Sequence, residues 1–242
     1  MIKFMLKIIL ISIFINSPVI AGEARIAVAS NFTNAIKAIA QRFEEQSGHK
    51  IVLIFGATGR FYAQIMNGAP FDAFFSADTR RPALLEQKGV ALSGSRFTYA
   101  LGKIVLFSPK AAYVDANVLK KMQYHYLAIA NPKLAPYGAA AKQVLEKLGL
   151  WNRLRFQMVR GENIGQTYQF VISGNAELGF VALSQIKQPG LAISGSYWKI
   201  PAKLYQPIKQ QAVLISHNPV AKAFMEFVRS DEAKTIIKGF GY

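Results

Sequence analysis

The sequence lacks cysteine altogether and is poor in acidic residues and histidine. Among its 242 residues there are no Cys, three His and 13 Asp and Glu, against 29 Lys and Arg. The absence of cysteine excludes disulfide scaffolds, thiolate zinc sites, cysteine nucleophiles and cysteine-held iron–sulfur clusters. The excess of basic residues gives a formal net charge of +16, which favours an anionic partner such as nucleic acid, an acidic membrane or a small oxyanion.

The usual enzyme motifs are also missing. There is no Gly-x-Ser-x-Gly elbow, no Walker loop, no Gly-x-Gly-x-x-Gly turn after a strand and no His-Glu-x-x-His pair. His49, His125 and His217 lie far apart in the sequence with no carboxylate cluster beside them. We therefore expect a protein that is not an enzyme, with no catalytic residues, no direct metal ligands and no cofactor. An exported hydrolase has little support.

Residues 1–21 have the features of a secretory signal peptide. Lys3 and Lys7 precede an apolar run at residues 8–15, and the segment ends in small residues at Ala21. The run is too short for a comfortable membrane span, although an uncleaved anchor is the alternative. Cleavage after Ala21 removes both lysines and lowers the net charge from +16 to +14.

The rest of the chain alternates short apolar runs with segments of helical period. The runs predicted to be buried strands are residues 25–29, 50–55, 73–76, 103–107, 127–130 and 178–183. Helical stripes are formed by Ile36, Ile39, Ala40 and Phe43, by Val144, Leu145 and Leu148, and by Ile164, Tyr168, Val171 and Ile172. This alternation predicts an α/β fold with mostly parallel sheets. Because there is no flexible linker, any second domain is joined by short structured crossings, for which residues 99–102 and 196–201 are the candidates.

Four junctions share one pattern, in which small, hydroxyl or amide residues lead directly into an amphipathic helix. They are Ser30-Asn31, Ala57-Thr58-Gly59, Pro136-Tyr137-Gly138 and Glu162-Asn163 before Ile164. Each one offers unpaired backbone N–H groups and the positive end of a helix dipole, which together suit an anion. Each is also an ordinary helix cap, and only the repetition of the pattern favours a binding site.

A series of short motifs runs through both halves of the chain. The motifs are residues 27–35, 55–59, 64–72 and 75–78 in the first half, and residues 131–138, 161–163 and 177–184 in the second. Together they resemble the periplasmic molybdate-binding proteins of ABC importers. Each is weak alone, but they occur in the family's order and spacing, so that the resemblance covers residues 22–242.

The resemblance implies a two-lobed fold, the type II periplasmic binding protein. Each lobe would be a mostly parallel sheet flanked by helices, and hinge crossings would join the lobes. Lobe I would comprise residues 22–100 and 201–242, and lobe II residues 101–200. The protein would be periplasmic, capture molybdate or tungstate between its lobes, and deliver it to a membrane permease of an ABC transporter. We expect a monomer that binds no nucleic acid.

The resemblance also implies the ligand contacts. Ser30 and Asn31 would bind through side-chain or backbone donors, Thr58 through its hydroxyl, and Tyr137 and Ile164 through backbone N–H groups from the other lobe. These are contacts to the oxygens of the ion. Some members of the family use a tyrosine where this sequence has Ala182, so one donor is missing unless the side chain of Tyr137 or Asn31 replaces it.

Several alternatives remain open at the level of sequence. Arg60, next to the Thr58 junction, is either an exposed first-turn residue, which we favour, or a charged group at the mouth of the cleft. The same fold can bind sulfate or another small oxyanion. The high charge by itself suggests a polyanion or nucleic-acid binder, but Lys and Arg are scattered and form no basic stripe.

Overall fold

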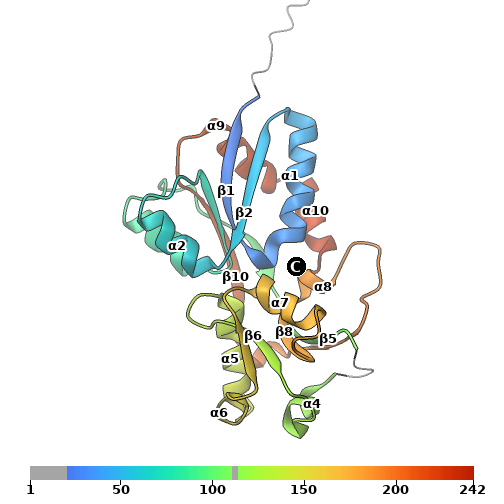
Figure 1. Cartoon of the computed structure of the whole chain (residues 1–242). Helices are drawn as coiled ribbons and strands as arrows, with labels where there is room; N and C mark the ends of the chain where they lie inside the picture. Colours follow the sequence, from blue (N-terminus) through green and yellow to red (C-terminus); the bar gives the residue numbers. More distant parts are fainter. Residues whose placement is uncertain (1–20, 111–113) are drawn as a thin grey trace, which may run out of the picture.

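The computed structural model of the chain describes residues 21–110 and 114–242. The predicted signal peptide therefore lies outside the described residues except for Ala21. In the described part of the chain, no helix combines the length and the apolar character needed to cross a membrane. The elements form two five-stranded sheets, one above the other in Figure 1.

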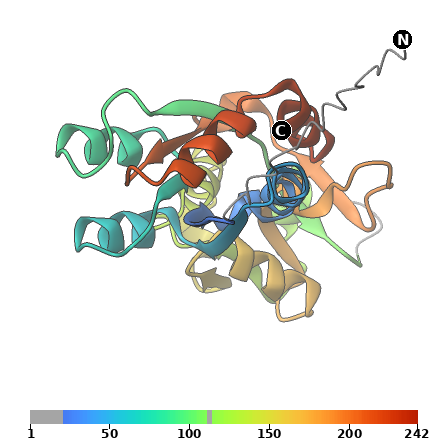
Figure 2. The ribbon, with the colours of Figure 1, turned by 90° about the horizontal axis from the view of Figure 1, so that it is seen from above.

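Sheet A has the strand order β2-β1-β3-β10-β4. Its strands are β1 (Glu23–Ala29), β2 (Lys50–Gly56), β3 (Ala73–Ser76), β4 (Phe97–Gly102) and β10 (Ile208–Leu214). One face packs against α1 (Thr33–Ser47), α9 (Pro219–Val228) and α10 (Asp231–Gly239), and the other against α2 (Thr58–Met66) and α3 (Arg80–Gln87). Viewed from above in Figure 2, α2 (teal) and α3 (green) lie next to one another and away from α1 (blue).

Sheet B has the strand order β7-β6-β8-β5-β9. Its strands are β5 (Ile104–Ser108), β6 (Leu127–Ala130), β7 (Met158–Gly161), β8 (Leu178–Ala182) and β9 (Ser196–Lys199). One face packs against α4 (Ala116–Lys121), α5 (Pro136–Lys147) and α6 (Trp151–Leu154), and the other against α7 (Ile164–Ile172) and α8 (Leu183–Ile186). Two short 3₁₀ turns complete the elements, η1 (Ser30–Phe32) and η2 (Ala202–Leu204).

The two sheets share one pattern of strand direction. In sheet A, β1 runs parallel to β2 and β3, β10 is antiparallel to β3, and β4 is antiparallel to β10. In sheet B, β6 runs parallel to β7 and β8, β5 is antiparallel to β8, and β9 is antiparallel to β5. Each sheet thus has a single strand opposed to the rest, which confirms the predicted α/β class with mostly parallel sheets.

The chain crosses between the sheets later than predicted at both places. β4 ends at Gly102 and β5 begins at Ile104, so Lys103 alone makes the first crossing. Residues 99–102, predicted as a crossing, are strand residues that pair with β10. The second crossing runs through residues 200–207, because residues 196–199 form β9. Both segments contain exposed positions, so neither is the continuous apolar run that predicts a buried strand. Sheet A therefore draws on residues 23–102 and 208–214, and sheet B on residues 104–199.

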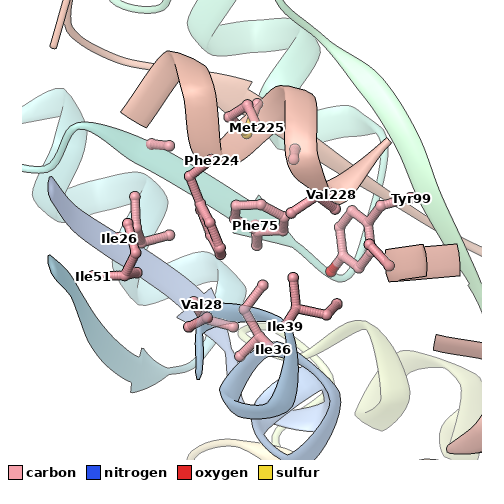
Figure 3. Packing of buried hydrophobic residues seen from close by; sticks show 14 of the residues in the cluster. Ile26, Val28, Ile36, Ile39, Ile51, Phe75, Tyr99, Phe224, Met225 and Val228 are labelled. Atoms are coloured by element: carbon pink, nitrogen blue, oxygen red, sulfur yellow. The ribbon is translucent and has the colours of Figure 1, made fainter. Parts of the chain in front are cut away.

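Buried hydrophobic side chains, among them Phe75, Tyr99 and Phe224, form the core between sheet A and the helices α1 and α9 (Figure 3). Phe32, the last residue of η1, is fully buried, and its ring centroid lies 4.5 Å from that of Tyr99 and 6.1 Å from that of Phe75. Phe75 in turn packs at 6.1 Å against Phe224 of α9. The turn at Ser30 is therefore fixed by large buried side chains on one side.

Candidate functional site

The four junctions converge on one small cavity between the two sheets. The helical segments begin at Ser30, Thr58, Pro136 and Ile164, as the sequence predicts. The cavity has a volume of about 10 Å³ on the scale at which one water molecule needs about 10–15 Å³, so it holds about one water molecule. Its lining includes all five predicted ligand residues and is completed by Ala29, Gly56, Ala57, Ala77, Ala135, Pro136 and Asn163.

Backbone N–H groups are the main donors that this cavity offers. Those of Asn31, Thr58, Tyr137 and Ile164 have no hydrogen-bond partner outside their own helical segments. The first N–H groups of a helix also lack a partner inside it, and they carry its positive dipole end. Four such ends around one cavity can hydrogen-bond an anion from several directions at once.

Thr58 adds a side-chain donor. It is 1% exposed, and its Oγ1 accepts a hydrogen bond of 3.1 Å from the backbone N–H of Ala77. Because that bond uses a lone pair of the hydroxyl oxygen, the hydroxyl hydrogen remains free to donate. The same hydroxyl therefore supports the loop after β3 and can contact a ligand.

Ser30 joins the two halves of the molecule. Its Oγ accepts from the N–H of Gly165 at 3.1 Å and donates to Oδ1 of Asn163 at 3.1 Å, both next to the start of α7. Asn163 also caps α7 by accepting from the N–H of Gln166 at 2.9 Å. The Ser30 hydroxyl is thus the point where the helix ends of the two sheets meet.

The side chains of Asn31 and Tyr137 belong to a buried network. Nδ2 of Asn31 donates to Oε1 of Gln210 at 2.7 Å and to the hydroxyl of Tyr242 at 3.0 Å, while its Oδ1 has no partner. The Tyr137 hydroxyl accepts from Nε2 of Gln210 at 3.1 Å. Burial raises the pKa of Tyr137 well above its usual value, so the phenol is neutral at pH 7. Both residues therefore face the cavity chiefly with their backbone N–H groups.

Three residues of this network were not found from the sequence. Gln210 of β10 is fully buried and also accepts from the Tyr99 hydroxyl at 3.0 Å. Tyr242 and Ser184 both donate to the carbonyl of Asn31, at 2.7 and 2.8 Å. Gln210 and Tyr242 lie outside the motifs, so no local signal marks them, whereas Ser184 is the last residue of the motif at residues 177–184 and was not interpreted as a contact. Ala182 does not line the cavity.

Arg60 forms an ion pair with Glu162, which links the two sides of the cavity. Its Nη1 lies 2.7 and 2.8 Å from the two carboxylate oxygens, and the side chains are 60% and 36% exposed. The hydrogen bond that Arg60 donates to Glu162 raises the pKa of Arg60 above its usual value. Arg60 is absent from the cavity lining, which agrees with the exposed first-turn interpretation.

The cavity contains no charged side chain, but a basic groove lies next to it. None of the residues that line the cavity is Asp, Glu, Lys, Arg or His. The groove shares Ala77, Ala135 and Pro136 with the cavity and is also lined by Arg80, Arg81, Lys133, Lys209 and a single acid, Asp78. Within the described ranges, no group of three or more His, Asp or Glu is placed to hold a metal ion. The site can therefore bind a small anion through neutral donors.

Comparison with known proteins identifies a family. Residues 24–242 match the model of the bacterial extracellular solute-binding protein family. The molybdate-binding protein ModA of Azotobacter vinelandii is 51% identical over 227 residues, which cover 92% of this chain and 90% of that protein. The molybdate-binding protein ModA of Rhodobacter capsulatus is 46% identical over 230 residues, covering 93% and 90%.

A solved structure shares the fold over nearly its whole length. The periplasmic molybdate-binding protein of Azotobacter vinelandii superposes with a TM-score of 0.87 at 44% sequence identity, covering 90% of this chain and 98% of that chain. The two five-stranded sheets with their flanking helices are therefore the type II periplasmic binding-protein architecture predicted from the sequence.

Proposed function

The chain belongs to the bacterial extracellular solute-binding protein family, and from this premise we propose that it captures molybdate or tungstate for an ABC importer. The observation that carries the proposal is the cavity, where Ser30, Asn31, Thr58, Tyr137 and Ile164 converge without any charged side chain. The names of the relatives at 51% and 46% identity agree with this ligand. The protein acts as a binding protein, and molybdate is its cargo.

Neutral donors suit a dianion that carries no proton. Each charge-assisted hydrogen bond to such an ion contributes roughly 1.5–3 kcal/mol, so several of them hold it without a counter-charge. Hydrogen phosphate brings a proton that needs an acceptor, and a buried donor left without one costs about 1–3 kcal/mol. Molybdate and tungstate carry no proton near neutral pH and are larger than sulfate, so cavity size selects between these ions.

Closure of two lobes delivers the second set of donors. Lobe I, which contains sheet A, would bind the ion first through Ser30, Asn31 and Thr58. Lobe II, which contains sheet B, would then bring the N–H groups of Tyr137 and Ile164, with rotation at the crossings. The contacts of Ser30 with Gly165 and of Arg60 with Glu162 support this proposal, because both join the two sides of the cavity.

Export and delivery follow from the same family membership. The closed form would dock on the membrane permease of the ABC importer, and the signal peptide would send the protein to the periplasm. We propose a monomer that binds no nucleic acid. The scattered Lys and Arg residues support this, since a polyanion binder needs a continuous basic stripe and loses affinity steeply with salt.

Thermal unfolding with a panel of anions tests the proposal. We expect molybdate and tungstate, each at 100 times its dissociation constant, to stabilise the protein by about 2.7 kcal/mol, a shift of roughly 5–10 °C for a chain of this size. Sulfate and phosphate at the same concentration and ionic strength serve as controls and should give no shift. A shift with sulfate alone would keep the fold and replace the ligand, whereas no shift with any anion would refute the proposed function.

A further inference from the structure

The phenol of Tyr242 is attached to the ligand-binding turn by two hydrogen bonds. It donates to the carbonyl of Asn31 at 2.7 Å and accepts from Nδ2 of the same residue at 3.0 Å. Its ring lies edge-on to Phe32, with the centroids 5.5 Å apart. Both residues belong to η1, so one side chain holds the backbone, the amide and the neighbouring ring of this turn.

The bond to the Asn31 carbonyl fixes the peptide group between Asn31 and Phe32, which directly follows the peptide group that carries the Asn31 N–H. Among the described residues, the only other side-chain donor to this carbonyl is Ser184 Oγ, at 2.8 Å, from α8 on the sheet B side. Tyr242 is therefore the donor on the sheet A side. Burial raises the pKa of the Tyr242 phenol, so it keeps its proton and continues to donate at neutral pH.

The residues beside Tyr242 connect it to the first crossing. The carbonyl of Gly241 accepts from Nζ of Lys103, the single residue between β4 and β5, at 3.0 Å. Gly241 has φ of +91°, and a Cβ there would lie 3.2 Å from side-chain atoms of Leu183 in α8. The chain end lies beside α8 in Figure 1, so this segment sits where the two sheets meet.

We propose that Tyr242 is a positioning residue for the anion site, which holds η1 so that the N–H of Asn31 points into the cavity. The identity of the anion in this inference rests on the proposed function. The structural link between Tyr242 and Asn31 does not depend on it. Tyr242 itself does not line the cavity and acts through Asn31.

The variant Tyr242→Phe tests the role, because it keeps the ring against Phe32 and removes only the hydroxyl. We expect the affinity for molybdate, measured by titration calorimetry, to fall about tenfold, since two hydrogen bonds to the turn are lost. Tyr124→Phe is the matched control. Tyr124 is a buried tyrosine of the sheet B side whose hydroxyl has no partner, so its removal should leave affinity unchanged.

A spectroscopic measurement separates positioning from general stability and needs no ligand. The amide nitrogen of Phe32 shares its peptide group with the Asn31 carbonyl, so its ¹⁵N resonance reports the Tyr242 hydrogen bond. We expect a clear shift of this resonance in ligand-free Tyr242→Phe and none in Tyr124→Phe. Wild-type affinity together with an unmoved resonance overturns the proposal.

The remaining outcomes are also decisive. A moved resonance with wild-type affinity shows the contact but refutes its role in positioning the site. If the wild-type protein fails to bind molybdate, the proposed function fails, and the Phe32 resonance still decides whether Tyr242 holds the turn. If the Phe32 resonance shifts equally in Tyr242→Phe and Tyr124→Phe, the shift reports a general change in packing, and the proposal is overturned.

Discussion

Gly165→Val is expected to lower the affinity for molybdate by at least 100-fold while leaving the unfolding of the ligand-free protein nearly unchanged. A Cβ at this position would lie 3.1 Å from Cβ and 3.4 Å from Oγ of Ser30, and the two methyl groups of valine extend beyond that. The added atoms would hold α7 away from η1, so the N–H groups of Tyr137 and Ile164 would not reach the ion. The loss of two charge-assisted hydrogen bonds, about 1.5–3 kcal/mol each, accounts for the magnitude.

The loss of affinity should depend on how much bulk is added at position 165. Gly165→Ala adds only the Cβ and should weaken binding less, because contacts of 3.0–3.4 Å require small adjustments. Ile172→Val, at an exposed position on the same helix, is the control and should bind as the wild type does. Titration calorimetry of the three variants, with thermal unfolding of each free protein, provides the comparison. Wild-type affinity in Gly165→Val would show that the site does not need contact between α7 and η1.

Thr58→Val has the second largest expected effect. It replaces the hydroxyl with a methyl group of similar shape and should weaken molybdate binding by about 1.5–3 kcal/mol, or roughly 10- to 100-fold. Unlike a purely ligand-facing residue, Thr58 also supports the protein, because its Oγ1 accepts from the N–H of Ala77. We therefore expect a loss of about 1–3 kcal/mol in the free energy of unfolding as well.

The two effects of Thr58 are separated by a conservative control. Thr58→Ser keeps the hydroxyl and should restore both affinity and stability, apart from the small cost of the lost methyl group. Denaturant unfolding and titration calorimetry measure the two quantities independently. If Thr58→Val loses stability but keeps its affinity, Thr58 is a structural residue and does not contact the ion.

Much of the fold follows from local patterns in the sequence. All six predicted strands are present, because each is a short apolar run, and all except the half-buried edge strand β2 are largely buried. β4, β7, β9 and β10 were not predicted, since they mix polar or exposed positions with apolar ones. β10 shows why. It lies inside sheet A, yet its first half contains Lys209, Gln210 and Gln211. The side chain of Gln210 is buried because partners from other elements satisfy its amide.

The helix starts around the cavity were predictable, but the hydrogen bonds of their residues were not. Each junction is a local feature of strand, turn and helix start, and all four occur where the sequence places them. The partners that orient them come from far along the chain. Asn31 is held by Gln210 and Tyr242, 179 and 211 residues away, and Ser30 contacts Gly165, 135 residues away. Such pairings depend on how the sheets come together, which no local pattern encodes.

The most direct test is a crystal structure of the chain from Gly22 grown with molybdate, with anomalous data collected on both sides of the molybdenum absorption edge. The account predicts one strong anomalous peak in the cavity, with oxygens within hydrogen-bonding distance of the N–H groups of Asn31, Thr58, Tyr137 and Ile164. A peak in the basic groove beside Arg80, Lys133 and Lys209 with none in the cavity would contradict it, because the ion would then be held by charge and not by the converging helix ends.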